Sequence, residues 1–205
     1  KTFQACFCSW TRTVAQVTDG EVVAVDGKPA RGSRDRGRGK HALHMVSAWG
    51  SRNRLVLGQE ATEEKSNEIT AIPKLLELLE LKGCIVTIDA MGCQTKIAAQ
   101  IVDQGGDYVL GLKGNQSTLH EEVKELFATA TAGGFAGVDY DYTEETDKEH
   151  GRLEVRRYWI TEELGTLSDT ERWQGLRSIG LVERECWIED RHTVEQRLFI
   201  NSIPA

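Results

Sequence analysis

Two short, mostly apolar runs in this chain each end on an aspartate. Cys84–Ile88 leads into Asp89, and Val22–Val25 leads into Asp26. Runs of this length, bounded by turn residues, are typical of strands buried in a sheet. A buried strand that stops on a carboxylate and then turns presents the acid at one edge of an α/β sheet. We therefore expect both aspartates to lie at strand ends.

The order of the expected elements limits the fold. Three early strands can pair antiparallel, and the strands that follow them alternate with helices. This order favours the mixed sheet of the RNase H-like fold, flanked by helices, over a purely parallel sheet. The expected elements are strands at 21–28, 44–49 and 54–62, a helix from 66 or 67 to 83, a strand at 84–89, a helix at 95–104, a strand at 107–112 and a helix at 119–130.

Two of these helices begin with capping signals. Ser66 or Asn67 is expected to cap the first, with Pro73 in or near its first turn, where proline is tolerated. Ile69 should lie on the apolar side of that helix. Ser117 is expected to cap the helix at 119–130.

The pattern changes after Gly133 and Gly134. From there on, alternating polar and apolar residues indicate strands. The expected elements are strands at 138–143, 150–160, 179–189 and 193–203, a short helix at 168–174 and a turn at 191–192. We therefore predict a helical segment at 1–20, a catalytic core at 21–132 and a β-rich insertion at 133–205.

Asp26 and Asp89 are expected to share divalent ions. Two carboxylates at neighbouring strand ends repel each other, and each raises the pKa of the other. A pair of Mg²⁺ ions removes that cost, because carboxylates are hard ligands that suit this cation. Two such ions can activate an attacking oxygen and stabilise a leaving one. The pattern therefore indicates metal-assisted phosphoryl transfer on nucleic acid.

A basic stretch begins directly after Asp26. Residues 28–40 contain six basic residues against one acid, Asp35, so the stretch carries +5 although the whole chain carries −7. Such a loop beside an acidic site can hold DNA phosphates, and it can also be a plain solvated loop. The six basic residues are Lys28, Arg31, Arg34, Arg36, Arg38 and Lys40.

Two other enzyme classes use strand-end acids. A phosphatase of the haloacid-dehalogenase type needs Asp-x-Asp after its first strand, and this chain has Asp26-Gly27-Lys28. A response-regulator receiver could match Asp89 and Lys113, but it needs an acidic pair after the first strand and no early hairpin. Lys113 could reach a phosphate from the end of its strand, or be solvated. His41 and His44 are expected to be exposed or satisfied in the core.

The cysteine pattern and the lack of long apolar runs indicate the compartment expected for the protein. The five cysteines include no Cys-x-x-Cys motif, and no Cys/His pair has ligand spacing, which argues against a zinc site. We expect reduced thiols in a cytoplasmic protein, with Cys84 acting as a small apolar residue. No apolar run approaches the ~20 residues that span a bilayer, and the N-terminus has no signal-peptide pattern. Without an initiator Met, both ends are expected to be cut from a longer chain.

Several longer motifs are distributed along the sequence. They are Val23–Lys28, Leu55–Gln59, Glu64–Ile69, Ile72-Pro73, Leu81–Gln94, Tyr108–Gln116 and His150–Glu154. Together they resemble the DDE transposases of H-repeat-associated (ISAs-type) insertion sequences, and this resemblance covers almost the whole chain. It implies a bacterial transposase with an RNase H-like core, in which Asp, Asp and Glu hold two Mg²⁺ ions and Mn²⁺ may substitute. Asp26 and Asp89 match the two aspartates.

The third acid of that family has no clear match. The resemblance implies a Glu in a Trp-x-Ile-Glu-Asn pattern on a final helix, expected beyond Ala205. Trp187-Ile188-Glu189 is one residue short of that spacing. Glu154 is the other candidate, and it alternates with Arg152 and Arg156 on one strand face. A cross-strand salt-bridge ladder, contact with the DNA backbone and metal ligation all remain open for these residues.

The resemblance therefore implies a catalytic-domain fragment that is itself inactive for lack of the third acid. The full-length protein would cleave DNA at the element ends and transfer the strand to target DNA, as a homo-oligomer. The alternatives are a stand-alone Mg²⁺-dependent RNase H-like nuclease and an inactive relic that only binds nucleic acid.

Overall fold

The computed structural model describes residue 6, residues 20–30, residue 33, and residues 43–62, 68–149 and 151–205. The chain divides into two compact units, residues 1–110 and 111–205. Most of the helical segment expected at 1–20 lies outside the described residues. The predicted boundaries at residues 20 and 132 remain predictions.

The first unit contains the mixed sheet expected from the order of elements. β1 pairs antiparallel with β2, and β2 with β3, while β1 pairs parallel with β4 and β4 with β5. The strand order is therefore β3-β2-β1-β4-β5, the arrangement of an RNase H-like core. The strands are β1 (Val22–Pro29), β2 (His44–Gly50), β3 (Leu55–Thr62), β4 (Ile85–Ile88) and β5 (Asp107–Leu112).

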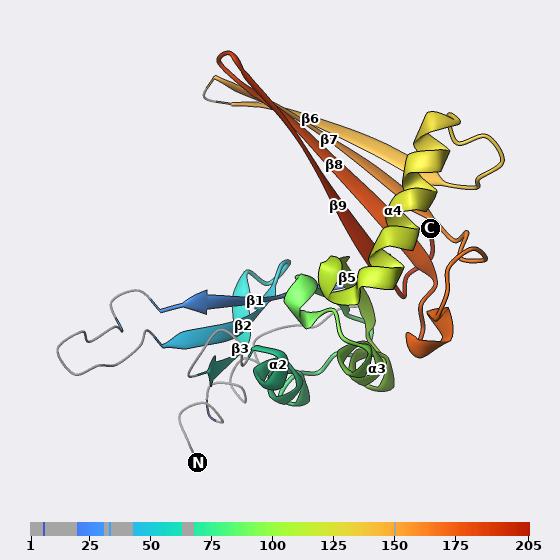
Figure 1. Ribbon diagram of the computed structural model, residues 1–205. Helices are drawn as coiled ribbons and strands as arrows, with labels where there is room; N and C mark the ends of the chain where they lie inside the picture. Colours follow the sequence, from blue (N-terminus) through green and yellow to red (C-terminus); the bar gives the residue numbers. More distant parts are fainter. Residues whose placement is uncertain (1–5, 7–19, 31–32, 34–42, 63–67, 150) are drawn as a thin grey trace. The chain divides into compact units, whose positions relative to one another are not determined.

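Two helices of this unit lie on the same side of its sheet. They are α2 (Glu68–Glu77) and α3 (Thr95–Asp103), drawn in green in Figure 1. α3 connects β4 to its parallel neighbour β5, which is the crossover that parallel pairing requires, and α2 leads from β3 into β4. Apolar side chains of strands and helices form the core between them. Its fully buried members include Val23, Val86, Tyr108, Leu110, Leu75, Leu76, Ile97 and Ile101.

The first helix differs from the sequence prediction. It ends at Glu77, not at Gly83, and Pro73 is its sixth residue, not part of the first turn. The proline costs the helix one backbone hydrogen bond, since its nitrogen carries no proton. Ile69 was expected to face the core but is 41% exposed. The two candidate caps, Ser66 and Asn67, lie outside the described residues.

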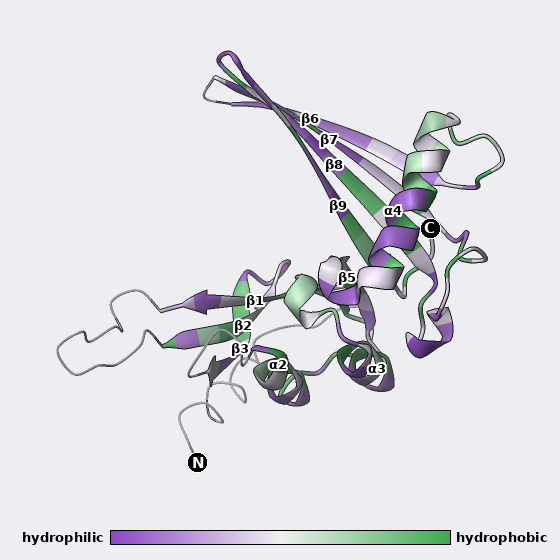
Figure 2. Ribbon diagram, viewed as in Figure 1, coloured by the Kyte–Doolittle hydropathy of each residue, from purple (hydrophilic) through white to green (hydrophobic). Residues whose placement is uncertain are grey.

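The second unit combines one helix with a four-stranded antiparallel sheet in the order β9-β8-β7-β6. The helix α4 (Ser117–Ala132) packs against β9 and buries Leu119, Val123 and Phe127. Figure 2 shows that β8 and β9 are apolar at the end near α4 and more hydrophilic further out. The strands are β6 (Asp141–Glu149), β7 (Arg152–Thr161), β8 (Ser178–Ile188) and β9 (Arg191–Asn201), with the short η5 (Thr170–Arg172) before β8.

Three predictions for this unit were wrong in detail. Ser117 is the first residue of α4, not its cap, because the 3₁₀ turn η4 (Gly114–Gln116) runs directly into the helix. The strand expected at 138–143 lies at 141–149, where every residue is exposed and no apolar alternation marks it. Arg191 and His192 begin β9, and the turn falls on Glu189-Asp190, where Glu189 adopts a φ of 51°.

The buried cysteines allow the packing of the core in both units to be tested. Cys84, Cys93 and Cys186 are buried thiols, which confirms the apolar role expected for Cys84. Burial raises the pKa of the Cys93 thiol to about 12, so it is protonated at neutral pH. We expect all three to resist an aromatic disulfide reagent until denaturant unfolds their unit, whereas exposed Cys6 reacts at once. Labelling of Cys93 in the folded chain, detected by mass spectrometry, would contradict the buried core described above.

Candidate metal centre

Asp26 and Asp89 lie at matching positions on neighbouring strands. Val25 and Ile88 are register partners in the parallel pair of β1 and β4, and each aspartate follows one of them. Neighbouring strands are about 4.8 Å apart. Val25 and Ile88 are buried, and strand alternation places the two exposed aspartates on the opposite face. The structure therefore brings the two acids predicted from the sequence to one edge of the first unit.

Asp89 is fixed by the turn that it begins. Its backbone stays extended, with φ −68° and ψ 175°, and its Oδ1 accepts a hydrogen bond from the Met91 N–H at 3.0 Å. This caps the 3₁₀ turn η3 (Ala90–Gly92). Gly92 is needed there, because a Cβ on it would collide with Ile88 Cγ2 and lie 3.0 Å from Ile72 Cδ1. One carboxylate oxygen of Asp89 accepts the hydrogen bond that caps the turn, and the exposed carboxylate can still bind a cation.

Asp26 has a lysine as its neighbour on the same strand face. Lys28 Nζ lies 2.9 Å from Asp26 Oδ2, and the two side chains are 81% and 54% exposed. An exposed pair of this kind contributes at most about 1 kcal/mol. A divalent ion at Asp26 can therefore displace the lysine, and Lys28 then becomes available to a phosphate.

A buried pair lies against Gly27, next to Asp26, and was not predicted from the sequence. His44 Nε2 contacts Glu68 Oε1, and the two residues are only 6% and 4% exposed. A Cβ on Gly27 would collide with the Glu68 carboxylate, whose Oε2 would lie 3.0 Å away. The first residue of α2 is thus held against β1 and β2 beside the candidate site. His44 is satisfied in the core, as expected for a histidine there.

The basic loop is described only at its ends. Ala30 N donates to Leu43 O at 2.7 Å, and the Ser33 hydroxyl donates to Ala30 O and accepts from Leu43 N, both at 2.7 Å. These bonds join the strands β1 and β2 at the base of the loop. Lys28 is exposed on β1. The other five basic residues, Arg31, Arg34, Arg36, Arg38 and Lys40, lie outside the described residues.

The remaining candidates belong to the second unit. Lys113 is exposed directly after β5. Glu154 is 1% exposed, with Arg184 Nη2 donating to its Oε2 at 2.6 Å, Arg152 Nε 3.6 Å from the same oxygen, and Arg156 against Oε1. The hydrogen bond from Arg184 is the largest cause that lowers the pKa of Glu154. This carboxylate is therefore surrounded by guanidinium groups, and its role as a metal ligand remains a prediction.

Comparison with known protein families identifies the family of this chain. The family described as Transposase DDE domain matches residues 17–187. The chain belongs to this transposase family. The putative transposase YncI of Escherichia coli O157:H7 is 46% identical over 178 residues, which are 86% of this chain and 45% of that protein. The H repeat-associated putative transposase YhhI of Escherichia coli K12 is 42% identical over 86% of this chain and 46% of that protein.

The H-repeat resemblance seen in the sequence is thereby confirmed. A further relative, described as an uncharacterized protein in the dhlA 3′ region of Xanthobacter autotrophicus, is 41% identical over 99% of this chain and 68% of that protein. This transposase domain spans about half the length of YncI and YhhI. A solved piggyBac transposase complex with hairpin DNA gives a TM-score of 0.43 at 10% identity, over 92% of this chain and 34% of that one, too low to support an argument.

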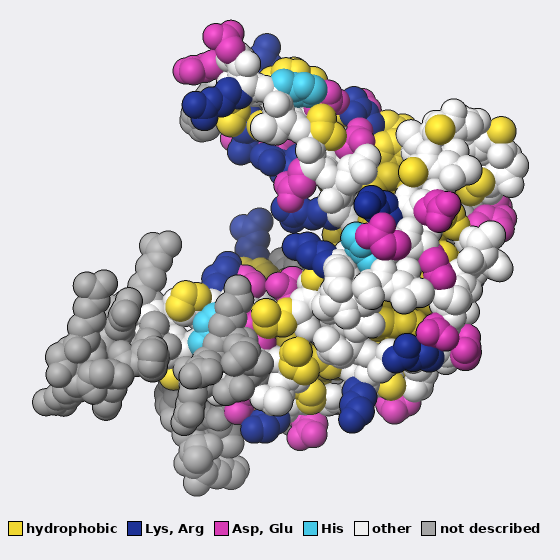
Figure 3. Space-filling view, in the orientation of Figure 1, with side chains coloured by type: hydrophobic (Ala, Val, Ile, Leu, Met, Phe, Trp, Pro, Cys, Tyr) yellow, Lys and Arg dark blue, Asp and Glu magenta, His cyan; other side chains and the backbone are white. Residues whose placement is uncertain are grey.

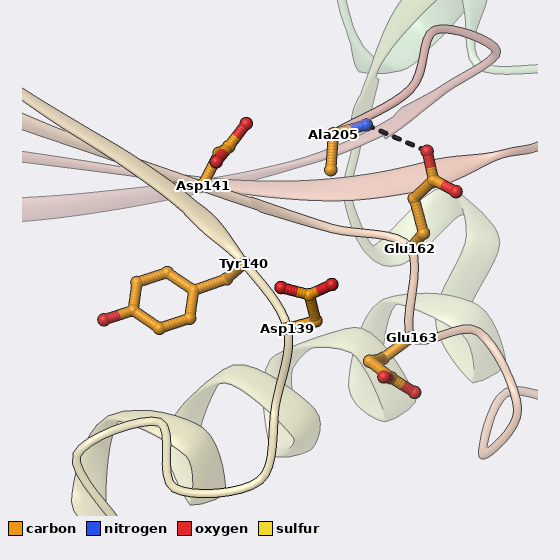
Figure 4. A pocket seen from close by; sticks show the side chains of 6 residues that line it. All are labelled: Asp139, Tyr140, Asp141, Glu162, Glu163 and Ala205. Atoms are coloured by element: carbon orange, nitrogen blue, oxygen red, sulfur yellow. Dashed lines mark hydrogen bonds between the residues drawn. The ribbon is translucent and has the colours of Figure 1, made fainter.

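The described part of this transposase domain contains no ready-made cluster of three or more His, Cys, Asp or Glu side chains suited to a metal. Carboxylates also gather in a pocket of about 390 Å³ formed by Asp139, Tyr140, Asp141, Glu162, Glu163 and Ala205, shown in Figure 4. There Glu162 Oε1 already accepts from Ala205 N at 3.1 Å and Arg177 Nε at 3.2 Å.

Among the described residues no helix is long and apolar enough to cross a membrane.

Proposed function

We propose that Asp26 and Asp89 of this transposase domain hold Mg²⁺ for DNA strand cleavage and strand transfer at the ends of an insertion sequence. The observation that supports this is the register of β1 and β4, in which Val25 is paired with Ile88, the residues directly before the two aspartates. Two exposed carboxylates on one face of adjacent strands fit Mg²⁺, which needs few protein ligands because it keeps waters and takes phosphate oxygens. Mn²⁺ can take its place.

The residues named in this proposal have distinct tasks. Asp26 and Asp89 bind the ions, and the capped turn after Asp89 keeps that carboxylate at the strand end. Lys28, released from Asp26, holds a phosphate together with the basic loop up to Lys40, and Lys113 of the second unit is a separate candidate for a phosphate contact. When bound, two such ions activate an attacking oxygen and stabilise a leaving one. Joining two element ends would require an oligomer of the whole protein.

We further infer that Glu154 is not the third acid. Its carboxylate is buried among three arginines, which satisfy its charge without a metal. The curated relatives are longer than this chain, and a third acid from outside it would complete the triad. The chain alone is therefore expected to bind the ion but not to cleave DNA.

A titration with Mn²⁺ tests the proposed site. Asp89→Asn should weaken Mn²⁺ binding at least tenfold, about 1.4 kcal/mol, because one of two charged ligands is lost. Asp103→Asn is the matched control, since this exposed acid ends α3 and precedes the start of β5, at the opposite end of the parallel strands. Binding can be followed by calorimetry. If Asp26→Asn and Asp89→Asn both bind Mn²⁺ like the parent chain, the metal site is wrong, and a domain that only binds nucleic acid is the better description.

A further inference from the structure

On β7, β8 and β9, the two faces of the second unit's sheet carry opposite charge. Arg156 and Arg157 are neighbours on β7, so strand alternation directs them to opposite faces. Arg156 is paired in register with Arg184 of β8, whereas Arg157 is paired with Glu183. The same strand therefore contributes one arginine to each of two differently charged surfaces.

On β7, β8 and β9, the face that carries Arg156 has an excess of positive charge. Its contacts form one network in which Glu154 meets Arg152, Arg156 and Arg184, while Glu195 meets Arg197 at 2.9 Å and Arg184 at 3.9 Å. Arg191 of β9 shares this face because it is paired with Ile188, so on β7, β8 and β9 five arginines minus two glutamates leave +3. Glu145, Asp147 and Glu149 of the neighbouring β6 lie on the same face and offset this charge along that edge. The arginine side chains of the network are 33–58% exposed, but that of Glu154 is only 1% exposed. The negative charge of Glu154 is thus inside the network, whereas the arginines and Glu195, whose side chain is 48% exposed, reach solvent.

The opposite face has an excess of negative charge. Arg157 contacts Glu144 at 2.9 Å, Glu183 at 3.1 Å and Glu185 at 2.8 Å. Lys148 is paired with Leu153 on this face, so two basic residues minus three glutamates leave −1 when His192, which contacts Glu185, is neutral. The charge of Arg157 is therefore fully used by its neighbours, and an anion would be repelled from this face.

Glu154 holds three half-buried arginines, Arg152, Arg156 and Arg184, in a fixed arrangement. A guanidinium has five N–H donors in a rigid fork, so a group that is bound to one carboxylate keeps other donors for a second anion. The border of this surface is β6, where Glu145 and Asp147 lie opposite Arg156 and Glu154. Glu145 accepts the Tyr158 hydroxyl at 3.2 Å. The basic surface is therefore confined to β7, β8 and β9, and Figure 3 shows Lys and Arg side chains interspersed with Asp and Glu on the second unit's sheet.

We propose that the arginine face, formed by Arg152, Arg156, Arg184 and Arg197, binds the phosphate backbone of DNA. This inference rests on the proposed function, because it names a surface by which the transposase domain would hold its DNA. Guanidinium groups match phosphate oxygens in pairs, which favours phosphate over a single point contact. Backbone contacts carry no sequence information, so binding here should be independent of DNA sequence.

The test compares two neighbouring arginines on opposite faces. The 205-residue chain is titrated with a fluorescent duplex of arbitrary sequence, in EDTA so that no metal site is involved, at several salt concentrations. Arg156→Gln should raise Kd roughly tenfold at about 0.1 M salt and reduce the slope of log K against log salt by about one. Arg184→Gln should do the same. Arg157→Gln removes the same charge and should change Kd less than about twofold.

A loss of DNA binding can be distinguished from a loss of folding. Melting temperatures identify any variant that unfolds, and Arg172→Gln, which removes an exposed pair with Asp169, is a second control for net charge. Equal weakening by Arg156→Gln and Arg157→Gln would overturn the arginine face and leave the metal proposal standing. Failure of the chain to bind DNA at any salt would overturn the face and the DNA partner together. If only the expected weakening of Mn²⁺ binding in the aspartate variants is not observed, the proposal of the arginine face still stands.

Discussion

Replacing Gly27 with alanine is expected to destabilise the first unit by about 1–3 kcal/mol, the usual cost of overpacking a core. In an ordinary strand the same change would be neutral or favourable, because glycine is a weak strand former. Here the new methyl group would collide with the Glu68 carboxylate, which is held by His44 and has little room to move. The collision would also shift β1 directly after Asp26, so we expect weaker Mn²⁺ binding as well.

Denaturant unfolding measures this cost. Gly165→Ala is the matched control, because a Cβ there meets nothing within 4 Å. In a Glu68→Ala background the obstacle is gone, and the cost of Gly27→Ala should shrink, as a double-mutant cycle would show. An unchanged unfolding midpoint for Gly27→Ala would mean that Glu68 does not lie against β1 as described.

Replacing Gly92 with alanine should have an effect of similar size, about 1–3 kcal/mol. The added Cβ would collide with Ile88 Cγ2 and lie 3.0 Å from Ile72 Cδ1, neither of which can move without disturbing the core. Since Gly92 N donates to Asp89 O at 3.0 Å, a shift of this residue also moves the turn that fixes Asp89. Both the unfolding free energy and the Mn²⁺ affinity should fall.

Gly114→Ala provides the comparison for this variant, because a Cβ at position 114 meets no neighbour within 4 Å. Ile88→Ala removes the main obstacle, and in that background Gly92→Ala should cost less than it does alone. If Gly92→Ala melts like the parent chain and binds Mn²⁺ equally well, the tight turn after β4 does not position Asp89.

The positions of the two acids could be predicted because buried strands leave a strong sequence signal. β4 and β5 are short apolar runs with clear turns on either side, and β5 begins and ends at the predicted residues. The alternation of Arg152, Glu154 and Arg156 was equally readable, since strand residues two apart share a face. The partner Arg184 could not be predicted, because it depends on the register between β7 and β8.

Other features left no local signal. β6 is an edge strand with every residue exposed, so it has no apolar period from which to find its limits. The contact between His44 and Glu68 joins residues 24 positions apart, and neither residue type indicates a buried pair by itself. Gly27 follows an aspartate, which usually signals a turn, whereas here it allows close approach of a side chain within a strand.

Iron-directed cleavage of the protein backbone tests the central claim most directly. Fe²⁺ in place of Mg²⁺, with ascorbate and peroxide, generates hydroxyl radicals that cut the chain close to the bound ion, and the fragments can be sized by mass spectrometry. We predict cuts beside both Asp26 and Asp89, suppressed by excess Mg²⁺ and lost in Asp26→Asn. Cuts around Asp139 and Glu162 instead, in the acidic pocket of the second unit, would contradict a shared ion at the ends of β1 and β4.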